Sequence, residues 1–146
     1  MSLLENEAVR SFVTWGTVCV VKMLAMGPLT ARQRFKTMVF ANPEDNPGSK
    51  KHDAPAVSEN VERVRRCHLN DLENIPAFLA LGAMLLVTNP SATIAIWHFR
   101  IFAVSRLLHT VCYLNGIQPF RALCYMVGTS VNLSMAGQIL YCIFAN

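Results

Sequence analysis

Four long stretches of mainly apolar residues alternate with shorter polar segments along this chain. They cover approximately residues 12–29, 62–87, 92–114 and 119–144. The last two each exceed 20 residues, which at about 1.5 Å per helical residue is enough to cross a hydrocarbon core about 30 Å thick. Only helices and closed barrels satisfy their backbone hydrogen bonds in lipid, and no segment alternates like a barrel strand. The pattern therefore predicts an all-α membrane protein built as a four-transmembrane-helix bundle.

The breaks between these stretches carry residues that are typical of helix ends. Thr88-Asn89-Pro90-Ser91 is a tight-turn signal, in which Ser91 suits the N-cap of the third helix. Asn115-Gly116 ends that helix, and Pro119 suits the first turn of the fourth. The polar segment at about residues 30–61 contains three prolines and is interpreted as the one long loop. No internal repeat occurs, so residues 1–146 are predicted to form a single domain.

Composition strengthens the membrane prediction. Apolar residues make up 53% of the 146 residues and charged residues only 15%, with a mean hydropathy of +0.33, whereas soluble domains carry about 25% charged residues. A cleaved signal peptide is the rival interpretation of the first stretch. The segment before it contains Glu5 and Glu7 against Arg10, whereas a signal peptide requires net positive charge there. The first stretch is therefore interpreted as a retained span.

The basic residues predict an orientation in the membrane. Eight of the thirteen lysines and arginines lie between Arg32 and Arg66, and the positive-inside rule places such a loop in the cytoplasm. Both termini then face the opposite side, and the short connection at residues 115–120 is cytoplasmic too. The net charge of +4 does not indicate nucleic-acid binding, because no polar domain presents these basic residues.

The acidic residues are confined to the first half of the chain. All nine precede residue 74, and the only formal charges after it are Arg100, Arg106 and Arg121. These arginines need Glu73, a carbonyl, a lipid headgroup or an anionic ligand as a partner. The five cysteines are dispersed without a C-x-x-C pair. That spacing argues against a metal site and against disulfides, and favours small apolar fillers in membrane helices.

Polar side chains recur at helical spacing on three of the predicted helices. The stripes are Arg63, Arg66, Asn70 and Glu73 on the second helix, Arg106, His109 and Tyr113 on the third, and Arg121, Tyr125 and Asn132 on the fourth. All three approach one depth near the cytoplasmic interface. Arginines near helix ends also snorkel to headgroups, and His98 and Arg100 are interpreted as structural residues that pair across helices. Together the stripes suit a small ligand with carboxylates and an ammonium.

Five segments resemble a known family, the membrane-associated proteins in eicosanoid and glutathione metabolism (MAPEG). They are FANPED (40–45), VERVRRCHLNDLEN (61–74), HFRIF (98–102), SRLLHTVCYL (105–114) and PFRAL (119–123). Their order and spacing agree with the family over nearly the whole chain, and the second segment is long enough to be highly specific. The resemblance implies a homotrimer that binds glutathione as a co-substrate between neighbouring subunits, near the cytoplasmic face.

The resemblance also implies roles for individual residues, and it implies no metal. Glutathione would be contacted or organised by Arg34, Arg65, Arg66, His68, Asn70, Glu73, His109 and Tyr113. Arg121 would be the catalytic residue and would stabilise the glutathione thiolate, the reactive form of a group whose free pKa is about 8.5. The thiolate would attack a hydrophobic electrophile from the bilayer. The same fold allows reduction of lipid hydroperoxides with electrons from glutathione.

Two positions favour the transferase branch of the family. Leu69 and Ala122 stand where the prostaglandin E synthase branch has an arginine and a serine. A glutathione-dependent isomerase of a lipid endoperoxide remains an alternative, as does a non-catalytic scaffold or anion transporter, although the sequence lacks the repeated halves of many transporters.

Pro76 lies three residues after Glu73, not four as is usual in the family, so a departure in packing is expected at residues 75–78. The resemblance implies the endoplasmic reticulum membrane, with the mitochondrial outer membrane as a second location.

Overall fold

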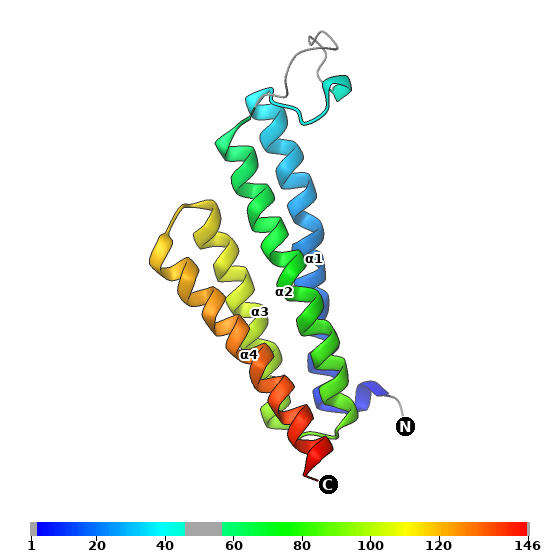
Figure 1. Cartoon of the computed structure of the whole chain (residues 1–146). Helices are drawn as coiled ribbons and strands as arrows, with labels where there is room; N and C mark the ends of the chain where they lie inside the picture. Colours follow the sequence, from blue (N-terminus) through cyan, green and yellow to red (C-terminus); the bar gives the residue numbers. More distant parts are fainter. Residues whose placement is uncertain (1–2, 46–56, 146) are drawn as a thin grey trace.

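The computed structural model describes residues 3–45 and 57–145, and these residues contain four long helices and no strand. The helices are α1 (Glu7–Thr37), α2 (Glu59–Val87), α3 (Ala92–Leu114) and α4 (Gln118–Phe144), with short 3-10 turns at Leu3–Glu5 and Pro43–Asp45. Figure 1 shows them as one elongated bundle. The predicted all-α fold of four helices is therefore confirmed.

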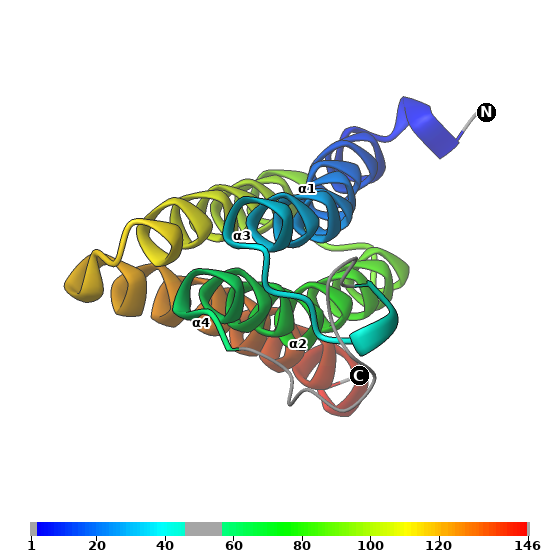
Figure 2. The same ribbon diagram turned by 90° about the horizontal axis from the view of Figure 1, so that it is seen from above.

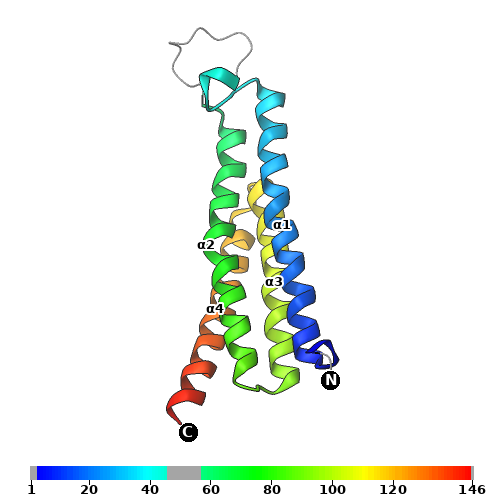
Figure 3. The same ribbon diagram turned by 90° about the vertical axis from the view of Figure 1, so that its right-hand side faces the viewer.

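The bundle is built around its two central helices. Helices α2 and α3 each pack against all three others, whereas α1 and α4 lie on opposite sides of that pair. The view from above shows this arrangement (Figure 2). Both termini lie at one end of the bundle together with the α2–α3 connection, and α1 and α2 extend beyond the other two helices at the opposite end (Figure 3).

The helix ends follow from local side-chain chemistry. Asn6 caps α1, because its Oδ1 accepts hydrogen bonds from the backbone N–H groups of Ala8 at 2.9 Å and Val9 at 3.3 Å. Pro119 lies in the first turn of α4, as its fixed φ predicts. Helix α1 continues past the apolar stretch that ends near residue 29, because hydrophobicity marks the membrane segment while the polar residues that follow are still good helix formers.

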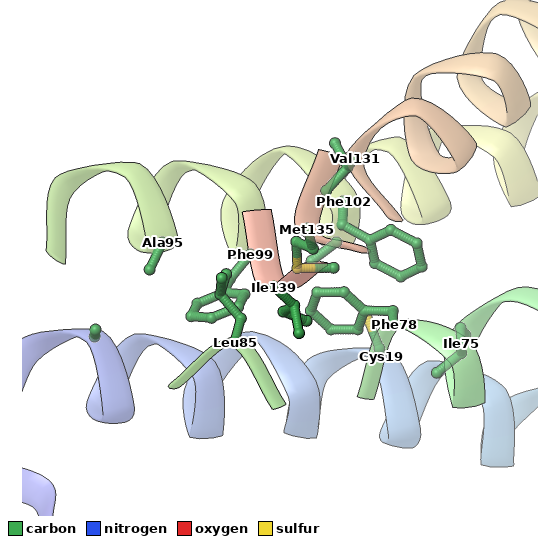
Figure 4. Close-up of a cluster of buried hydrophobic side chains, with 12 residues drawn as sticks. Cys19, Ile75, Phe78, Leu85, Ala95, Phe99, Phe102, Val131, Met135 and Ile139 are labelled. Carbon is green, nitrogen blue, oxygen red and sulfur yellow. The ribbon is translucent and has the colours of Figure 1, made fainter. Parts of the chain in front are cut away.

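The core contains side chains from all four helices, including three aromatic rings from α2 and α3 (Figure 4). Phe78 of α2 stacks on Phe102 of α3 with ring centroids 4.0 Å apart and planes 6° apart. Phe99 packs edge-on against Phe78, and Phe12 of α1 lies 5.2 Å from Phe99. Residues 75 and 78 are both fully buried. The segment at residues 75–78, where the position of Pro76 led us to expect a departure in packing, is therefore well packed.

Three of the helices, α1, α2 and α4, are long and apolar enough to cross a membrane. Two arginines and two histidines lower the hydropathy of α3. Large apolar side chains on all four helices face outward, among them Leu24, Met84, Leu108 and Leu133. All five cysteines lie in the described part of the chain, and none of them forms a disulfide there. An apolar exterior over this length indicates a lipid environment.

Candidate functional site

A buried network of charged groups joins α1, α2 and α3. Asp71 of α2 has 0% of its surface exposed and Arg106 of α3 has 1%. Arg106 Nη2 lies 2.8 Å from Asp71 Oδ1, and Lys22 of α1 forms an ion pair with Asp71 Oδ2. Buried charges persist where they are paired and hydrogen-bonded. Two cations and one carboxylate leave this network with a formal excess of one positive charge.

Asp71 corrects one expectation from the sequence. Glu73 was one of four alternative partners expected for the arginines of the second half of the chain, together with a carbonyl, a lipid headgroup and an anionic ligand. In the structure Arg106 instead pairs with Asp71, and Glu73 is exposed. Residues two apart on a helix point about 200° apart, so the two carboxylates lie on nearly opposite faces. A signal was present in the sequence: Asp71 lies at helical spacing with Val64, Cys67, Ile75 and Phe78 of the buried face.

Arg106 extends the network to two of the predicted ligand-binding residues. Its Nη2 donates to Asn70 Oδ1 at 2.6 Å and contacts His109 Nδ1 at 3.3 Å. His109 is 2% exposed and forms part of the α3 face that packs inside the bundle. Arg106 belongs to the polar stripe predicted on the third helix, and the structure places it at the centre of this cluster.

A chain of ring contacts continues from His109 to the start of α4. The His109 and Tyr113 ring centroids are 5.5 Å apart. The Arg121 guanidinium carbon lies 4.7 Å from the centroid of the Tyr113 ring, a cation–π arrangement. Asn70, His109, Tyr113 and Arg121, which were predicted from three separate helices, therefore lie in one continuous series of contacts.

Of the other predicted residues, Arg66 approaches this series through its interaction with the Tyr113 side chain, and the rest lie apart from it. Arg65 and Arg66 pair with Glu62 at 2.7 Å and Glu59 at 2.6 Å on the outside of α2. His68 is half-buried on the same helix. Arg34 lies in the last turn of α1 beside a cavity of about 200 Å³ that Phe40 also lines. No hydrogen bond or ion pair links the Arg34 side chain to the rest of the predicted set within the described residues.

His98 has the structural role that was predicted for it. Its Nδ1 lies 2.7 Å from the Ile94 carbonyl, and its Nε2 lies 2.9 Å from the Ser134 hydroxyl and 3.1 Å from the Gln138 amide nitrogen, both on α4. Arg100 instead packs over the ring of Trp97 on its own helix. The polar atoms of His98 therefore join α3 to α4.

An apolar groove of about 650 Å³ runs between α3 and α4 on the outer surface. Trp97, Ile101, Met126 and Val127 are among the side chains that line it. Among the described residues, no group of three or more His, Cys, Asp or Glu side chains is placed to hold a metal ion. The molecule thus combines an exterior suited to apolar compounds with an internal polar series that ends at Arg121.

These features define the class of protein. It is a four-helix membrane protein in which a buried arginine organises hydrogen-bonding side chains from α2 and α3, and in which further arginines gather toward one end of the bundle. Arginine clusters of this kind bind carboxylates, since the guanidinium fork matches a carboxylate in geometry and charge. The arrangement therefore suits a small anion beside the bilayer.

Comparison with known proteins specifies the family. The sequence pattern of the MAPEG family matches residues 12–141, and the chain belongs to this family. It is 44% identical to mouse microsomal glutathione S-transferase 1 and 41% identical to the human protein, in each case over 94% of this chain and 92% of the relative. It is 35% identical to human prostaglandin E synthase over 95% of this chain and 92% of the relative.

Proposed function

We propose that this chain is a membrane-bound glutathione transferase that joins the thiol of glutathione to hydrophobic electrophiles. The observation that carries the proposal is the unbroken series of contacts from Asn70 through Arg106, His109 and Tyr113 to Arg121. It connects an internal polar cluster to an arginine at the start of α4. The identity to the microsomal transferases, over nearly the full length of both chains, supports the same activity.

The charges of glutathione suit the side chains in this region. Its two carboxylates fit the guanidinium groups of Arg34, Arg65 and Arg66. Arg65 and Arg66 pair on α2 with the partly exposed Glu62 and the exposed Glu59, which a ligand can displace. Its ammonium fits the exposed Glu73 carboxylate. The polar groups of His68, Asn70, His109 and Tyr113 then hydrogen-bond the peptide part.

Arg121 is the proposed catalytic residue. A guanidinium beside the glutathione thiol favours the thiolate, because the anion gains an opposite charge that the neutral thiol does not use. The thiolate attacks the electrophilic carbon, the new carbon–sulfur bond forms, and the leaving group departs with the electron pair of its broken bond. Contact with the Tyr113 ring holds Arg121 in place for this role.

The site we propose is completed by a second copy of the chain. Arg34 lies at the end of α1, away from the series that leads to Arg121, and within the described residues nothing brings the two together. Exposed apolar side chains on α2, such as Leu69 and Leu72, provide a surface for packing between subunits. A homotrimer with glutathione between neighbours brings Arg34 of one subunit to the α2–α4 residues of another.

The second substrate is proposed to arrive through the bilayer. The groove between α3 and α4 opens on the outer surface and is apolar, so it suits a hydrophobic electrophile. Lipid hydroperoxides are proposed as further substrates. In that reaction two glutathione molecules give up two electrons and two protons to form a disulfide, and the hydroperoxide becomes an alcohol and water.

We place the protein in the endoplasmic reticulum membrane, with the mitochondrial outer membrane as a second site.

Isomerisation of a lipid endoperoxide is the second candidate, because human prostaglandin E synthase is also a relative. Both positions that separate the two branches carry the transferase residue: Leu69 is exposed on α2, and Ala122 is exposed beside Arg121. Turnover of a prostaglandin endoperoxide faster than glutathione conjugation would reverse this order.

The first prediction concerns Arg121. With the detergent-solubilised protein, glutathione and an aryl halide, we expect Arg121→Ala to lower kcat by about 100-fold or more, the usual effect of losing one group that stabilises developing negative charge. The Kd for glutathione, measured by calorimetry, should change by less than about threefold, because the other arginines and Glu73 provide most of the proposed binding contacts.

Arg100→Ala is the matched control, since Arg100 is an exposed arginine that packs on a tryptophan of α3. Arg100→Ala should have the wild-type kcat and the wild-type Kd for glutathione. No conjugate formation by the wild-type protein, together with no binding of glutathione sulfonate, would exclude the proposed function. Equal kcat for Arg121→Ala and wild type would exclude only the role of Arg121.

A further inference from the structure

Arg106 determines how its polar neighbours are oriented. A guanidinium group has only N–H donors, so every atom that it hydrogen-bonds must be an acceptor. Two of its neighbours are residues whose orientation heavy-atom positions do not define: the side-chain amide of Asn70 has two ends of similar shape, and the His109 ring has two possible sites for its proton. Contact with Arg106 resolves both.

Asn70 must present its oxygen to Arg106. The 2.6 Å contact from Arg106 Nη2 is therefore to Oδ1, and the Nδ2 group faces away from the buried network. Nδ2 makes no hydrogen bond to any of the residues 3–45 and 57–145. Asn70 is half-buried, so this group is a donor that is held in position and available to a ligand.

Contact with Arg106 also determines which nitrogen of the His109 ring carries the proton. Its Nδ1 accepts from Arg106 at 3.3 Å, which places the proton of the neutral ring on Nε2 and makes Nε2 a donor. His98 on the same helix has the opposite tautomer, because its Nδ1 faces the Ile94 carbonyl and must donate. Its Nε2 then accepts from Ser134 and Gln138.

Asp71 and Lys22 hold Arg106 in the orientation that sets both donors. Nη2 has two hydrogens for the three acceptors on Asn70, Asp71 and His109, so one hydrogen is shared between two of them. The contact to His109 is the longest of the three, and it forms only while the contacts to Asn70 and Asp71 hold Nη2 in place. The Nε and Nη1 atoms of Arg106 are buried and hydrogen-bond no described residue. Nη2 is thus the anchored end of the guanidinium, and the Asp71 carboxylate anchors it while Lys22 holds Asp71 from the side of α1.

We propose that Lys22, Asp71 and Arg106 are positioning residues that turn the N–H donors of Asn70 and His109 toward bound glutathione. This inference rests on the proposed glutathione site and adds the reason why that site contains a buried ion network that does not touch the reacting sulfur. The same network stabilises the His109 ring, which packs on Tyr113, and Tyr113 in turn contacts Arg121.

The test compares Arg106→Lys with Arg100→Lys in the full chain. Lysine keeps the positive charge of Arg106, but its side chain is one bond shorter, so its Nζ falls short of the Nη2 position that contacts both Asn70 and Asp71. We expect Arg106→Lys to raise the Kd for glutathione at least about tenfold, the effect of losing one well-placed hydrogen bond. Arg100→Lys, an exposed substitution on the same helix, should leave the Kd unchanged.

A second measurement reads the tautomers directly. In the ¹⁵N spectrum of the histidine-labelled wild-type protein, the neutral His109 ring should carry its proton on Nε2 and the neutral His98 ring on Nδ1, with resonances assigned through His109→Gln and His98→Gln. In Arg106→Lys, the His109 signal should move toward a mixture of tautomers while the His98 signal stays. A merely structural role of Arg106 predicts no selective change at His109.

The two proposals fail in different ways. Absence of glutathione binding by the wild-type protein would overturn the proposed function, while the tautomer measurement does not require glutathione. A proton on Nδ1 of His109 in the wild-type protein would overturn the positioning proposal, even if Arg106→Lys does not fold. Normal glutathione affinity of a folded Arg106→Lys would overturn it as well.

Discussion

Asp71 is a carboxylate in an apolar interior, where two cations share its charge. Lys22 reaches it from α1 and Arg106 from α3, and its own side chain is completely buried. Removing one member of a buried ion pair typically costs about 3–5 kcal/mol, because the remaining charge is left uncompensated. The network also defines the rotation of α1: a slip of one residue would turn Lys22 by about 100° away from Asp71.

Gly82 is a second residue whose identity is set by close packing. A methyl group at this position would lie 2.8 Å from Cδ2 of Phe12 and 3.3 Å from Cε1 of Phe99. Phe12 belongs to the aromatic cluster with Phe78 and Phe99, so a shift of its ring disturbs the packing of that cluster. We expect Gly82→Ala to lower the free energy of unfolding by about 1–3 kcal/mol, as overpacked cores do, measured by thermal unfolding in detergent.

Gly137→Ala is the control for that substitution. Among the described residues, no atom beyond the adjacent residues and the backbone of α4 lies within 4 Å of a methyl group at Gly137, and alanine in a helix interior is favoured over glycine by about 1 kcal/mol. This variant should therefore be as stable as the wild type or more stable. A Gly82→Ala protein that unfolds at the wild-type temperature would show that the cluster adapts without cost.

Spacing along the helices predicted which residues share a face but not which neighbour each face meets. It identified Asn70, His109 and Tyr113, and the structure places all three in the series that ends at Arg121; their role in binding stays a prediction. It did not identify Asp71 as the partner of Arg106, because the choice between Asp71 and Glu73 depends on how α2 is rotated against α3. That rotation is decided by packing between residues distant in the sequence, such as Phe78 and Phe102.

At the scale of helices, the apolar stretches predicted number and order better than ends. All four helices occur where expected, but α1 begins at Glu7 and extends to Thr37. Hydrophobicity reports contact with lipid, whereas a helix ends where its capping chemistry changes. At the end of α1 the cap is Met38, whose backbone adopts the left-handed conformation with φ of 52° and whose N–H bonds to the Arg34 carbonyl.

Met38 makes this helix end a site where stability can be gained. A left-handed backbone costs an L-residue about 1–2 kcal/mol, and glycine is the usual residue at such a position. The Met38 side chain is 60% exposed, so little packing is lost with it. We expect Met38→Gly to raise the free energy of unfolding by about 0.5–1 kcal/mol, after allowing for the greater chain entropy of glycine, again measured by thermal unfolding.

Asn89 provides the comparison within the same chain. It also has a left-handed backbone, with φ of 51°, but asparagine tolerates this conformation. Asn89→Gly should therefore gain less than Met38→Gly. An equal gain at both positions would mean that Met38 is not strained more than Asn89, and a loss at Met38 would mean that its side chain makes a stabilising contact.

For the whole molecule, the arrangement of the four helices brings the proposed site to one end. Arg34 lies in the last turn of α1, Tyr113 at the end of α3 and Arg121 at the start of α4. Because the helices alternate in direction, these three positions and the first half of α2 lie at the end opposite the two termini, as Figures 1 and 3 show. The arginines that the positive-inside rule uses for orientation are thus partly the arginines proposed to bind glutathione.

This coincidence leads to a prediction about topology. A cytoplasmic pool of glutathione reaches the site only if the Arg34–Arg121 end faces the cytoplasm, and the excess of lysine and arginine there gives the same orientation. In sealed microsomes, an epitope tag at either terminus should resist added protease, and a tag after Asn115 should be cleaved. All three tags should be cleaved once detergent opens the vesicles. Protection of the tag after Asn115 together with cleavage at both termini would reverse the orientation and leave the arginines on the side away from cytoplasmic glutathione, so the proposed function would then need a different source of that substrate.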